Sequence, residues 1–319
     1  MTNKRKPEKQ KKLVDLLKLA ADYLGSRNIE SARLESEMLL SDLLGYSRVQ
    51  LYLNYDRPLT EDELQEYRNR LKRRSAGEPL QYILGYTEFY NIRIKTAQGV
   101  FIPRPESELI IELAEKNKPV KGFFRRTLDL GCGSGALALS LLNEKLALEV
   151  VAVDKSTEAF ELTRENAVAL GFKERLSQGN RVDLVKSSVT SSVKNNNLKN
   201  QQIISIRKDD FLNRKTSFTG AFNLIVSNPP YIEEKLLNSL PVEVRKYEPK
   251  TALISGADGL DAHRWFAITL PDILADDGLF LGEIEQSKGV KTQRIHQKWG
   301  RTVIHKDLAG NDRVIEVWR

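Results

Sequence analysis

Apolar residues in the first 75 positions recur at the spacing of amphipathic helices. In residues 13–24 they fall at every third or fourth position, and Gly25 follows as a suitable stop. Ser31 is a candidate N-cap for a second helix. A third helix is expected after Thr60, because Thr60 and Glu63 form the pattern of a capping box ahead of an apolar face. The pattern predicts a small helical domain.

From Pro79 onward the pattern changes to short apolar runs with many aromatic residues, "LQYILGYTEFYNIRI". Such runs are typical of a hairpin or a linker. We therefore expect a domain boundary near residue 90. Residues 1–90 are interpreted as an N-terminal helical domain with its hairpin linker, and residues 91–319 as a second domain.

Beyond Arg126, short apolar runs alternate with helical patterns. This alternation predicts a mostly parallel sheet of seven strands with helices on both faces, an α/β fold. The expected strands are 127–130, 149–153, 203–206, 222–227, 278–284 and the two runs "RTVIH" and "DRVIEVW" near the end of the chain.

One segment does not fit this alternation. Residues 171–203, between the second and third expected strands, are rich in Ser, Asn and Lys and show no lasting period. We interpret this segment as a flexible surface insertion.

Composition narrows the class of protein. A chain of 319 residues exceeds the usual size of a single core, which agrees with two domains. No stretch resembles a membrane span, and the basic N-terminus lacks the apolar core of a signal peptide, so we expect a cytoplasmic protein.

The single cysteine, Cys132, and three scattered histidines predict neither disulfides nor a metal site. The net charge of +7 is spread along the chain, which leaves plain solubility and an acidic partner both open.

A glycine-rich turn, "TLDLGCGSGALALSLL", leads from the first of these strands into a helix. Gly131, Gly133 and Gly135 permit positive φ and let a ligand approach the amides at the helix N-terminus. Asp154 ends the next strand, about 20 residues further on, where a carboxylate can accept the hydroxyls of a ribose. Together these features favour a nucleoside cofactor. The third glycine comes one place too early for the dinucleotide pattern G-x-G-x-x-G.

This pattern, "DLGCGSG" followed by "VD", resembles the cofactor site of the class I S-adenosylmethionine-dependent methyltransferases, which have a Rossmann-like fold. The resemblance implies a ribose contact at Asp154 and an adenine site at Asp210 and Phe211 of "KDDFL", with a core position as the alternative for Phe211. It implies further cofactor contacts or support of the turn at Asp129, Gly131, Cys132, Gly133, Ser134 and Gly135.

The strand at 222–227 ends in the sequence Asn228-Pro229-Pro230-Tyr231. Because the carboxyl ends of parallel strands meet at one edge of a sheet, this corner is expected beside the glycine turn. The two prolines restrict the residues before them to extended conformations. The corner therefore holds the Asn228 side chain and the Pro229 carbonyl in place.

Two rigid acceptor oxygens suit methyl transfer to an NH2 group whose lone pair is conjugated. If Asn228 Oδ1 and the Pro229 carbonyl accept both N–H bonds, the lone pair turns toward the methyl donor and the developing positive charge is stabilised. Tyr231 can stack on the planar group and exclude water. Adenine N6, cytosine N4 and a glutamine amide all carry such a group, so this motif leaves DNA, RNA and protein open as substrates.

Three longer stretches resemble the glutamine N5-methyltransferases of peptide chain release factors, the HemK or PrmC family: "GEPLQYILGYTEFY", "VFIPRPESELIIELA" and "YEPKTALISGADGL". The resemblance runs over nearly the whole chain. It implies that the N-terminal helical domain and the methyltransferase domain together bind a release factor. The Asn-Pro-Pro-Tyr motif would hold the glutamine of the factor's Gly-Gly-Gln motif, and Asn228 would also face the cofactor.

The same resemblance implies that Phe101 and Arg104 line the approach to this glutamine, with a proline-stiffened linker as the alternative interpretation of "FIPRPE". Ser107 stands where the family usually has threonine. We expect S-adenosylmethionine as cofactor, S-adenosylhomocysteine as its product, no membrane partner and a monomer.

Two other functions compete with this hypothesis. One is an amino-methyltransferase acting on adenine N6 or cytosine N4 of nucleic acid, and the other is a non-catalytic, cofactor-bound module that binds translation factors. The residues after 231 are nearly consumed in completing the sheet, which leaves little room for a target-recognition region and favours protein over nucleic acid.

Overall fold

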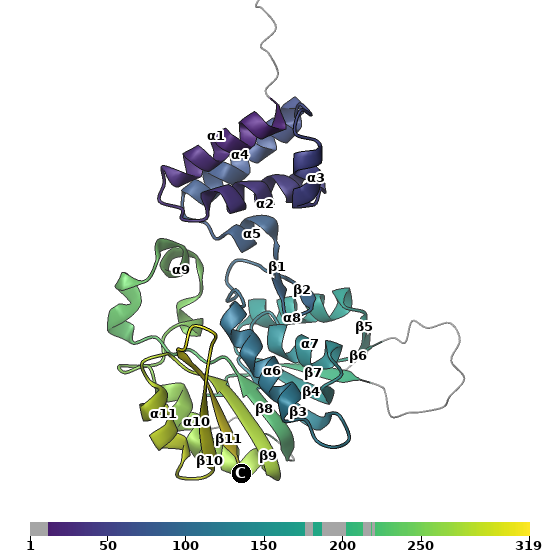
Figure 1. Ribbon diagram of the computed structural model, residues 1–319. Coiled ribbons are helices and arrows are strands. Elements are labelled where there is room, and N and C mark those ends of the chain that lie inside the picture. Colours follow the sequence, from purple (N-terminus) through teal and green to yellow (C-terminus); the bar gives the residue numbers. More distant parts are fainter. Residues whose placement is uncertain (1–11, 176–180, 187–201, 213–217, 219–220) are drawn as a thin grey trace, which may run out of the picture. The chain divides into compact units, whose positions relative to one another are not determined.

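Separate hydrophobic cores divide the chain into two units (Figure 1). Unit 1 comprises Met1–Gly85 and Val242–Tyr247, and unit 2 comprises Tyr86–Pro241 and Glu248–Arg319. The computed structural model describes residues 12–175, 181–186, 202–212, 218 and 221–319.

Unit 1 is helical, as the apolar spacing predicts. Thr60 and Glu63 form the predicted capping box, in which Thr60 Oγ1 accepts from the Glu63 N–H at 3.2 Å and the Thr60 N–H donates to Glu63 Oε2 at 2.9 Å. Ser31 stands at the N-cap of the second helix, but its side chain makes no capping hydrogen bond. The helices of unit 1 are α1 (Leu13–Gly25), α2 (Ala32–Leu44), α3 (Arg48–Leu53), α4 (Glu61–Ser75), α5 (Leu80–Leu84) and α9 (Val242–Tyr247).

Helix α9 joins unit 1 from far along the chain, which no sequence pattern predicts. The buried Arg74 at the end of α4 forms ion pairs with Glu35 and, at 2.8 Å, with Glu243 of α9. The first segment of unit 1 ends at Gly85, so the hairpin that the boundary at residue 90 assigns to the first domain belongs to unit 2.

Unit 2 is built on a mostly parallel sheet that contains all seven predicted strands (Figure 1). Among the described residues its order is β10-β11-β9-β8-β3-β4-β7-β6-β5, with the parallel strands β9, β8, β3, β4 and β7 at the centre. The seven strands are β3 (Phe124–Leu130), β4 (Ala147–Asp154), β7 (Ile203–Lys208), β8 (Phe222–Ser227), β9 (Leu274–Glu283), β10 (Arg301–Lys306) and β11 (Asp312–Trp318). The hairpin consists of β1 (Tyr86–Phe89) and β2 (Ile92–Lys95), paired antiparallel.

Two further strands correct part of the interpretation of residues 171–203 as a flexible surface insertion. Strand β5 (Phe172–Arg175) pairs antiparallel with β6 (Arg181–Lys186), which pairs antiparallel with β7. Open backbone groups at the edge of β7 account for this extension, because an edge strand accepts further strands by main-chain pairing. Residues 176–180 and 187–201 of the predicted insertion lie outside the described residues.

Helices cover both faces of the sheet, and alternate residues of each central strand enter opposite cores. In β4, Val150 and Ala152 belong to one core, whereas Val151 and Val153 belong to the other. Because both faces of these strands are buried, their sequences are continuous apolar runs. One core contains residues of α6 (Glu108–Lys116), α7 (Ala136–Asn143) and α8 (Thr157–Ala169), the other residues of α10 (Asp261–Ile273), and α11 (Gly289–His296) contacts α10 and β11.

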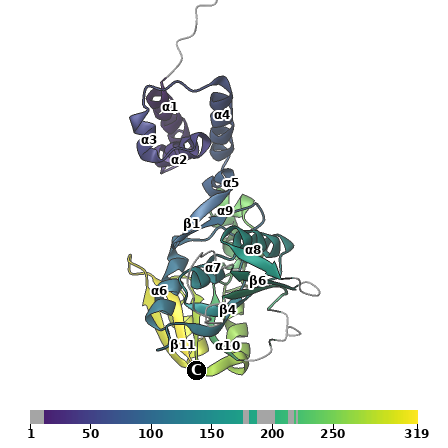
Figure 2. The ribbon, with the colours of Figure 1, turned by 90° about the vertical axis from the view of Figure 1, so that its right-hand side faces the viewer.

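The parallel strands end at a common edge, which positions the predicted site. Asp154 is the last residue of β4, Asn228 follows β8, and Glu283 is the last residue of β9. The glycine turn follows β3 at this same edge. Figure 2 shows the sheet from a second direction, with α6 and α10 beside it. None of the helices in the described part of the chain is long and apolar enough to cross a membrane.

Candidate active site

The glycine turn after β3 has the backbone geometry that its sequence predicts. Gly131, Gly133 and Gly135 adopt φ of 77°, 55° and 83°. A Cβ at Gly135 would lie 2.8 Å from Thr163 Cγ2, whereas a Cβ at Gly133 would meet no atom within 4 Å. Gly135 is therefore required for packing against α8, and Gly133 leaves open space beside the turn.

The other residues of the turn contribute mainly their backbone. The Gly131 and Cys132 N–H groups both donate to the Val153 carbonyl, at 2.8 and 3.0 Å. The Cys132 side chain is buried in the core, and burial raises the pKa of its thiol. Ser134 is also buried, and its carbonyl accepts from Asn166 Nδ2 at 2.9 Å.

Asp129 supports the turn from within the fold. This buried carboxylate accepts from the Ala138 N–H in the first turn of α7 through Oδ2, at 3.1 Å. Its Oδ1 is buried and has no hydrogen-bond partner among the described residues. Burial, reinforced by the charge of Asp154, raises the pKa of Asp129 to about 7. Asp129 thus ties the end of β3 to the start of α7.

Asp154 at the tip of β4 holds the turn and retains acceptor capacity. Its Oδ2 accepts from the Gly133 N–H and its Oδ1 from the Ser156 N–H, both at 2.9 Å. Burial raises the pKa of Asp154, and these two backbone hydrogen bonds partly offset that rise. Each carboxylate oxygen has two acceptor positions, so one on each oxygen remains for the hydroxyls of a bound ribose.

Asp210 and Phe211 follow β7 at the same edge. Asp210 is exposed and accepts from the Leu212 N–H at 3.2 Å. The Phe211 ring is buried, lies stacked against Phe266 with centroids 5.9 Å apart, and approaches the position of a Gly131 Cβ at 3.4 Å. One face of this ring is thus used in core packing, and its edge borders the glycine turn.

The Asn-Pro-Pro-Tyr corner is held by a hydrogen bond at each end. Before it, Ser227 Oγ donates to the Leu130 carbonyl of β3 at 2.7 Å. After it, the Tyr231 carbonyl accepts from Lys288 Nζ at 3.0 Å. A Cβ at Gly259 would lie 2.3 Å from this carbonyl oxygen and 2.2 Å from Lys288 Nζ, so the "GADGL" stretch must carry glycine here.

The Asn228 side chain is held by one end only. Its Nδ2 donates to Ser107 Oγ at 2.8 Å. Among the described residues, no donor is paired with Asn228 Oδ1 or with the Pro229 carbonyl. Asn228 is partly exposed. Two acceptor oxygens of the corner therefore remain without a donor in the described part of the chain, and their role in holding a substrate nitrogen stays a prediction.

Two residues that sequence reasoning did not assign complete this corner. Ser107 is buried at the junction of η1 (Pro105–Ser107) with α6, and its hydroxyl donates to the buried carboxylate of Glu283. Tyr231 also forms a side-chain hydrogen bond with Glu283. Burial raises the pKa of Glu283 to about 7. The only sequence signal was Ser107, a hydroxyl where the resembling family has threonine.

Phe101 and Arg104 lie together near Tyr231. The Arg104 guanidinium stands 4.8 Å from the centroid of the Phe101 ring and forms an ion pair with the buried Glu248. Its charge acts to lower the pKa of Tyr231, although burial and the charge of Glu283 raise that pKa overall. The ion pair uses part of the Arg104 guanidinium to hold this segment in place.

A buried pair of histidines contacts the backbone carbonyl of Glu283. His263 Nε2 lies 3.1 Å from the Glu283 carbonyl oxygen, and His263 Nδ1 lies 3.1 Å from His296 Nε2. Since a carbonyl only accepts, His263 Nε2 carries the proton, and His296 Nε2 must donate to His263 Nδ1. Burial lowers the pKa of His263 to about 4. Both rings are therefore neutral at pH 7.

We expect the stability contributed by His263 to decline in acid. Its pKa is lower in the folded protein than the ordinary 6.5, so its contribution is complete above pH 6.5 and falls by about 3 kcal/mol toward pH 4. Asp129 and Glu283, whose pKa values are raised, change stability in the opposite sense. Urea unfolding of wild type and His263→Gln at several pH values isolates the histidine. The difference in unfolding free energy between the two proteins should narrow from pH 7 to pH 4. A constant difference would contradict the lowered pKa of His263.

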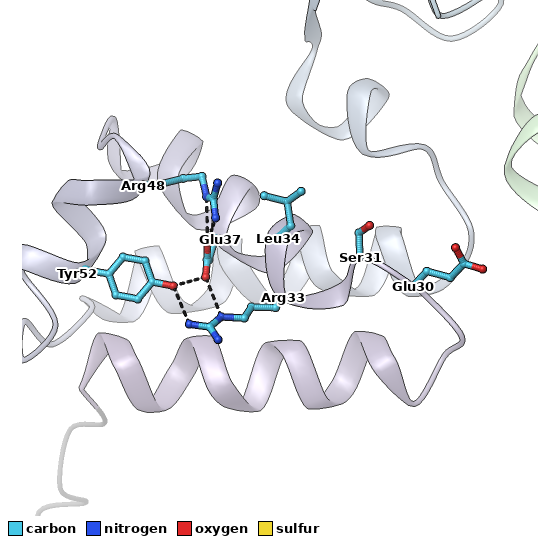
Figure 3. A pocket seen from close by; sticks show the side chains of 7 residues that line it. All are labelled: Glu30, Ser31, Arg33, Leu34, Glu37, Arg48 and Tyr52. Atoms are coloured by element: carbon cyan, nitrogen blue, oxygen red, sulfur yellow. Dashed lines mark hydrogen bonds and ion pairs between the residues drawn. The ribbon is translucent and has the colours of Figure 1, made fainter. Parts of the chain in front are cut away.

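Unit 1 contains a pocket, but none of the predicted site residues lines it (Figure 3). The lining residues are Glu30, Ser31, Arg33, Leu34, Glu37, Arg48 and Tyr52. Among the described residues of the whole chain, no group of three or more His, Cys, Asp or Glu side chains is placed to hold a metal ion.

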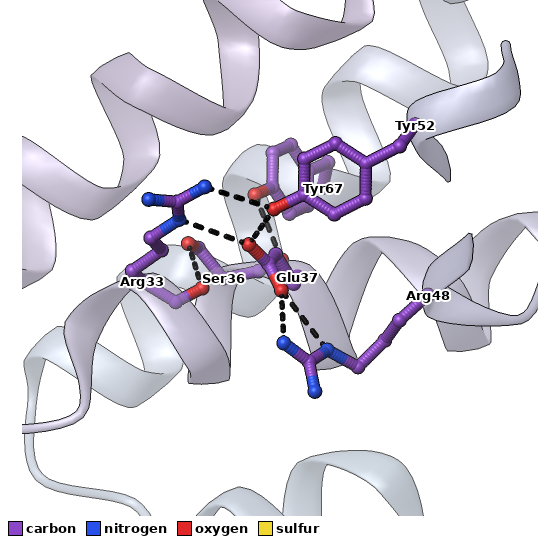
Figure 4. A network of polar contacts seen from close by, with 6 residues as sticks. All are labelled: Arg33, Ser36, Glu37, Arg48, Tyr52 and Tyr67. Atoms are coloured by element: carbon purple, nitrogen blue, oxygen red, sulfur yellow. Dashed lines mark hydrogen bonds and ion pairs between the residues drawn. The ribbon is translucent and has the colours of Figure 1, made fainter. Parts of the chain in front are cut away.

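Three polar side chains of this pocket hold the buried carboxylate of Glu37 (Figure 4). Glu37 accepts from Arg33 Nε at 3.2 Å, from Arg48 Nε and Nη2 at 2.9 and 2.6 Å, and from the Tyr52 hydroxyl. Burial acts to raise the pKa of Glu37, but the hydrogen bonds from Tyr52, Arg48 and Arg33 outweigh it and lower that pKa. This network joins α2 to α3 and stabilises unit 1.

Three family models match successive parts of the chain. The PrmC N-terminal domain matches residues 15–85, the methyltransferase small domain matches residues 91–189, and the Eco57I restriction-modification methylase matches residues 149–269. The first match lies within the segment Met1–Gly85 of unit 1. The other two cover the glycine turn and the Asn-Pro-Pro-Tyr corner.

Curated relatives are similar over most of the chain. The release factor glutamine methyltransferase of Chlorobaculum tepidum is 32% identical over 292 residues, which cover 90% of each protein. That of Geobacter sulfurreducens is 36% identical over 262 residues, covering 82% of this chain and 80% of the relative. A solved structure, the release factor-specific protein-(glutamine-N5) methyltransferase of Alicyclobacillus acidocaldarius, is 23% identical, with a TM-score of 0.37 over 68% of this chain and 94% of that chain.

Proposed function

The chain belongs to the family of release factor glutamine methyltransferases, and on this premise we propose that it transfers a methyl group from S-adenosylmethionine to the side-chain amide nitrogen N5 of a glutamine in a peptide chain release factor. The glutamine is that of the factor's Gly-Gly-Gln motif, and S-adenosylhomocysteine is the second product. The observation that carries this proposal is the Asn228 amide, which Ser107 holds by its nitrogen while its oxygen stays available at the strand edge.

The residues at this edge fit the cofactor. Gly133 leaves open space beside the turn, and Asp154 keeps acceptor positions for two ribose hydroxyls. We assign cofactor binding to the turn 131–135 with these residues, to Asp210 and Phe211 on the adenine side, and to Asn228. The cofactor supplies a methyl group on a positively charged sulfur.

The Asn-Pro-Pro-Tyr corner orients the substrate nitrogen. Asn228 Oδ1 and the Pro229 carbonyl accept its two N–H bonds, which points the lone pair away from both oxygens. As the new N–C bond forms, the nitrogen becomes positively charged, and these two acceptors stabilise that charge. The nitrogen then releases one proton to water and becomes a neutral secondary amide. The Tyr231 ring and Pro230 cover the planar amide and exclude water.

Recognition of the release factor extends beyond the glutamine. We assign it to unit 1 and to Phe101 and Arg104 beside the corner. The Arg104–Glu248 ion pair holds the "FIPRPE" segment in place, and the charge of Arg104 reaches Tyr231. The match of residues 15–85 to the PrmC N-terminal domain supports this role for unit 1.

A methylation assay with peptide mass spectrometry tests the proposed function. Purified protein is incubated with methyl-labelled S-adenosylmethionine and a recombinant bacterial release factor. We expect one methyl group on the glutamine of the Gly-Gly-Gln peptide and none when that glutamine is replaced by alanine. Label on other residues, or on none, would reject the proposal.

A nucleic-acid amino-methyltransferase is the second candidate, favoured by the Eco57I restriction-modification methylase model over residues 149–269. That model covers the corner but not the segment Met1–Gly85 of unit 1. The same assay distinguishes the two functions when double-stranded DNA and RNA replace the release factor. Methylated adenine N6 or cytosine N4, without methylated protein, would establish the second candidate in place of the first.

A further inference from the structure

Two hydroxyl groups converge on one buried carboxylate behind the Asn-Pro-Pro-Tyr corner. The Ser107 hydroxyl donates to Glu283 Oε2, and Tyr231 bonds to the same carboxylate through its side chain. Glu283 and Ser107 are each 2% exposed. Water is therefore excluded from this contact, and within the described residues the hydrogen bonds of the carboxylate come from these two hydroxyl groups.

The Ser107 hydroxyl has only one hydrogen, and this hydrogen is given to Glu283. Toward Asn228, 2.8 Å away, Ser107 Oγ can therefore only accept. The two ends of an asparagine amide have nearly the same shape, so the hydrogen-bond partners decide which end faces which neighbour. Here they require Asn228 Nδ2 to face Ser107 and Oδ1 to face the other way.

We propose that Glu283 and Ser107 are positioning residues that set the polarity of the Asn228 amide, so that Oδ1 and not Nδ2 meets the substrate. The proposal rests on the proposed function, in which the substrate offers N–H bonds to this corner. A reversed amide would place a donor against a donor and would remove one of the two acceptors that stabilise the charge on nitrogen. Glu283 and Ser107 touch no reacting atom and act through Asn228.

The protonation state of Glu283 is part of this arrangement. A protonated carboxyl has its own O–H, which it can donate to Ser107. Ser107 would then donate its hydrogen toward Asn228 and select Oδ1, which reverses the amide. The ionised carboxylate is therefore the active form.

Several groups face Glu283 and affect its ionisation. After burial, the hydrogen bonds from Ser107 and Tyr231 favour the charged form, the charge of Glu106 opposes it, and the charge of Arg313 favours it. His263 is neutral and contacts only the Glu283 backbone carbonyl. Since the pKa of Glu283 is raised to about 7, we expect kcat to rise with pH across an apparent pKa near 7.

Four variants and a pH profile test the proposal. Ser107→Ala should lower kcat for release-factor methylation by about 10- to 100-fold, because a mispositioned group costs about that much. The KM for the cofactor should stay within about twofold, and Ser107→Thr should restore kcat, since it restores the hydroxyl. Glu283→Gln should remove the dependence on pH near 7. Glu285→Gln, the same change two residues away, should behave as wild type.

A structural role alone would give a different result. If Ser107 only filled space, threonine would not restore kcat, and Ser107→Ala would lower thermal stability and affect both KM values. Equal kcat in wild type and Ser107→Ala, or an unchanged pH profile in Glu283→Gln, would overturn the proposal.

A measurement without turnover separates this proposal from the proposed function. In protein labelled with 15N-asparagine, the Asn228 side-chain protons should be protected from exchange, and their resonance should titrate near pH 7. Ser107→Ala should abolish both effects. Protection without release-factor methylation would reject the proposed function and support the positioning role. An unprotected Asn228 amide in an active enzyme would reject the positioning role alone.

Discussion

Replacing Asn228 by alanine is expected to lower kcat for release-factor methylation by about 100- to 1000-fold, which corresponds to about 3–4 kcal/mol of transition-state stabilisation. The variant loses one of the two acceptors that orient the substrate nitrogen and stabilise its charge. It loses no hydrogen bond to the glycine turn, because within the described residues the Asn228 side chain is hydrogen-bonded to Ser107 alone. Steady-state kinetics with calorimetry of cofactor binding check this, and the cofactor Kd should stay within about threefold.

A matched control lies in β8, the strand that precedes the corner. Asn223 of β8 accepts from the Arg126 N–H at 3.2 Å and takes no part in the corner. Asn223→Ala should therefore leave kcat within about twofold of wild type while removing a side chain of the same size. If Asn228→Ala keeps wild-type turnover, the Asn-Pro-Pro-Tyr corner does not activate the substrate. Under the non-catalytic hypothesis, Asn228→Ala would also preserve the effect of the protein in cells.

Replacing Asp154 by alanine is expected to weaken binding of S-adenosylmethionine by about 100-fold. Hydrogen bonds to a charged group contribute about 1.5–3 kcal/mol each, and the loss of the ribose contacts accounts for this change. The Gly133 and Ser156 N–H groups would also lose their acceptors, which loosens the glycine turn. Calorimetric titration gives the Kd, and kcat at saturating cofactor should fall much less than the affinity.

The control for Asp154 is an exposed carboxylate of the same unit. Asp272→Ala on α10 removes the same charge from an exposed position and should leave the cofactor Kd unchanged. Circular dichroism and thermal unfolding distinguish lost affinity from lost folding. A folded Asp154→Ala protein with wild-type affinity would show that the carboxylate serves only to brace the turn.

Local signals in the sequence were sufficient for most of unit 2. Strand β4 is apolar on both faces, the turn after β3 has glycine at three positions with positive φ, and two prolines follow Asn228. Each of these features depends on residues that are close neighbours in the sequence. Parallel strands end at one edge of a sheet, and this rule by itself predicts that Asp154 and Asn228 lie at the same edge.

Residues 171–203 show where such local signals fail. Their polar composition lacks the apolar period of a strand, yet β5 and β6 pair with the edge of the sheet. Backbone hydrogen bonds supply this pairing, and they depend little on side-chain type. Local signals also miss the packing of α9 within unit 1, because the ion pair of Arg74 with Glu243 joins residues far apart in the chain.

The sequence by itself determined the alternation of strands and helices, the glycine turn with Asp154, and the proline-stiffened Asn228. Only the tertiary structure decided that Ser107, Tyr231 and Glu283 share one buried hydrogen-bond network, which selects the end of the Asn228 amide that faces the substrate. Propensity and periodicity act within a few residues of chain. The partners of a buried polar side chain depend on how α6 packs against β9, and that packing is a property of the folded core.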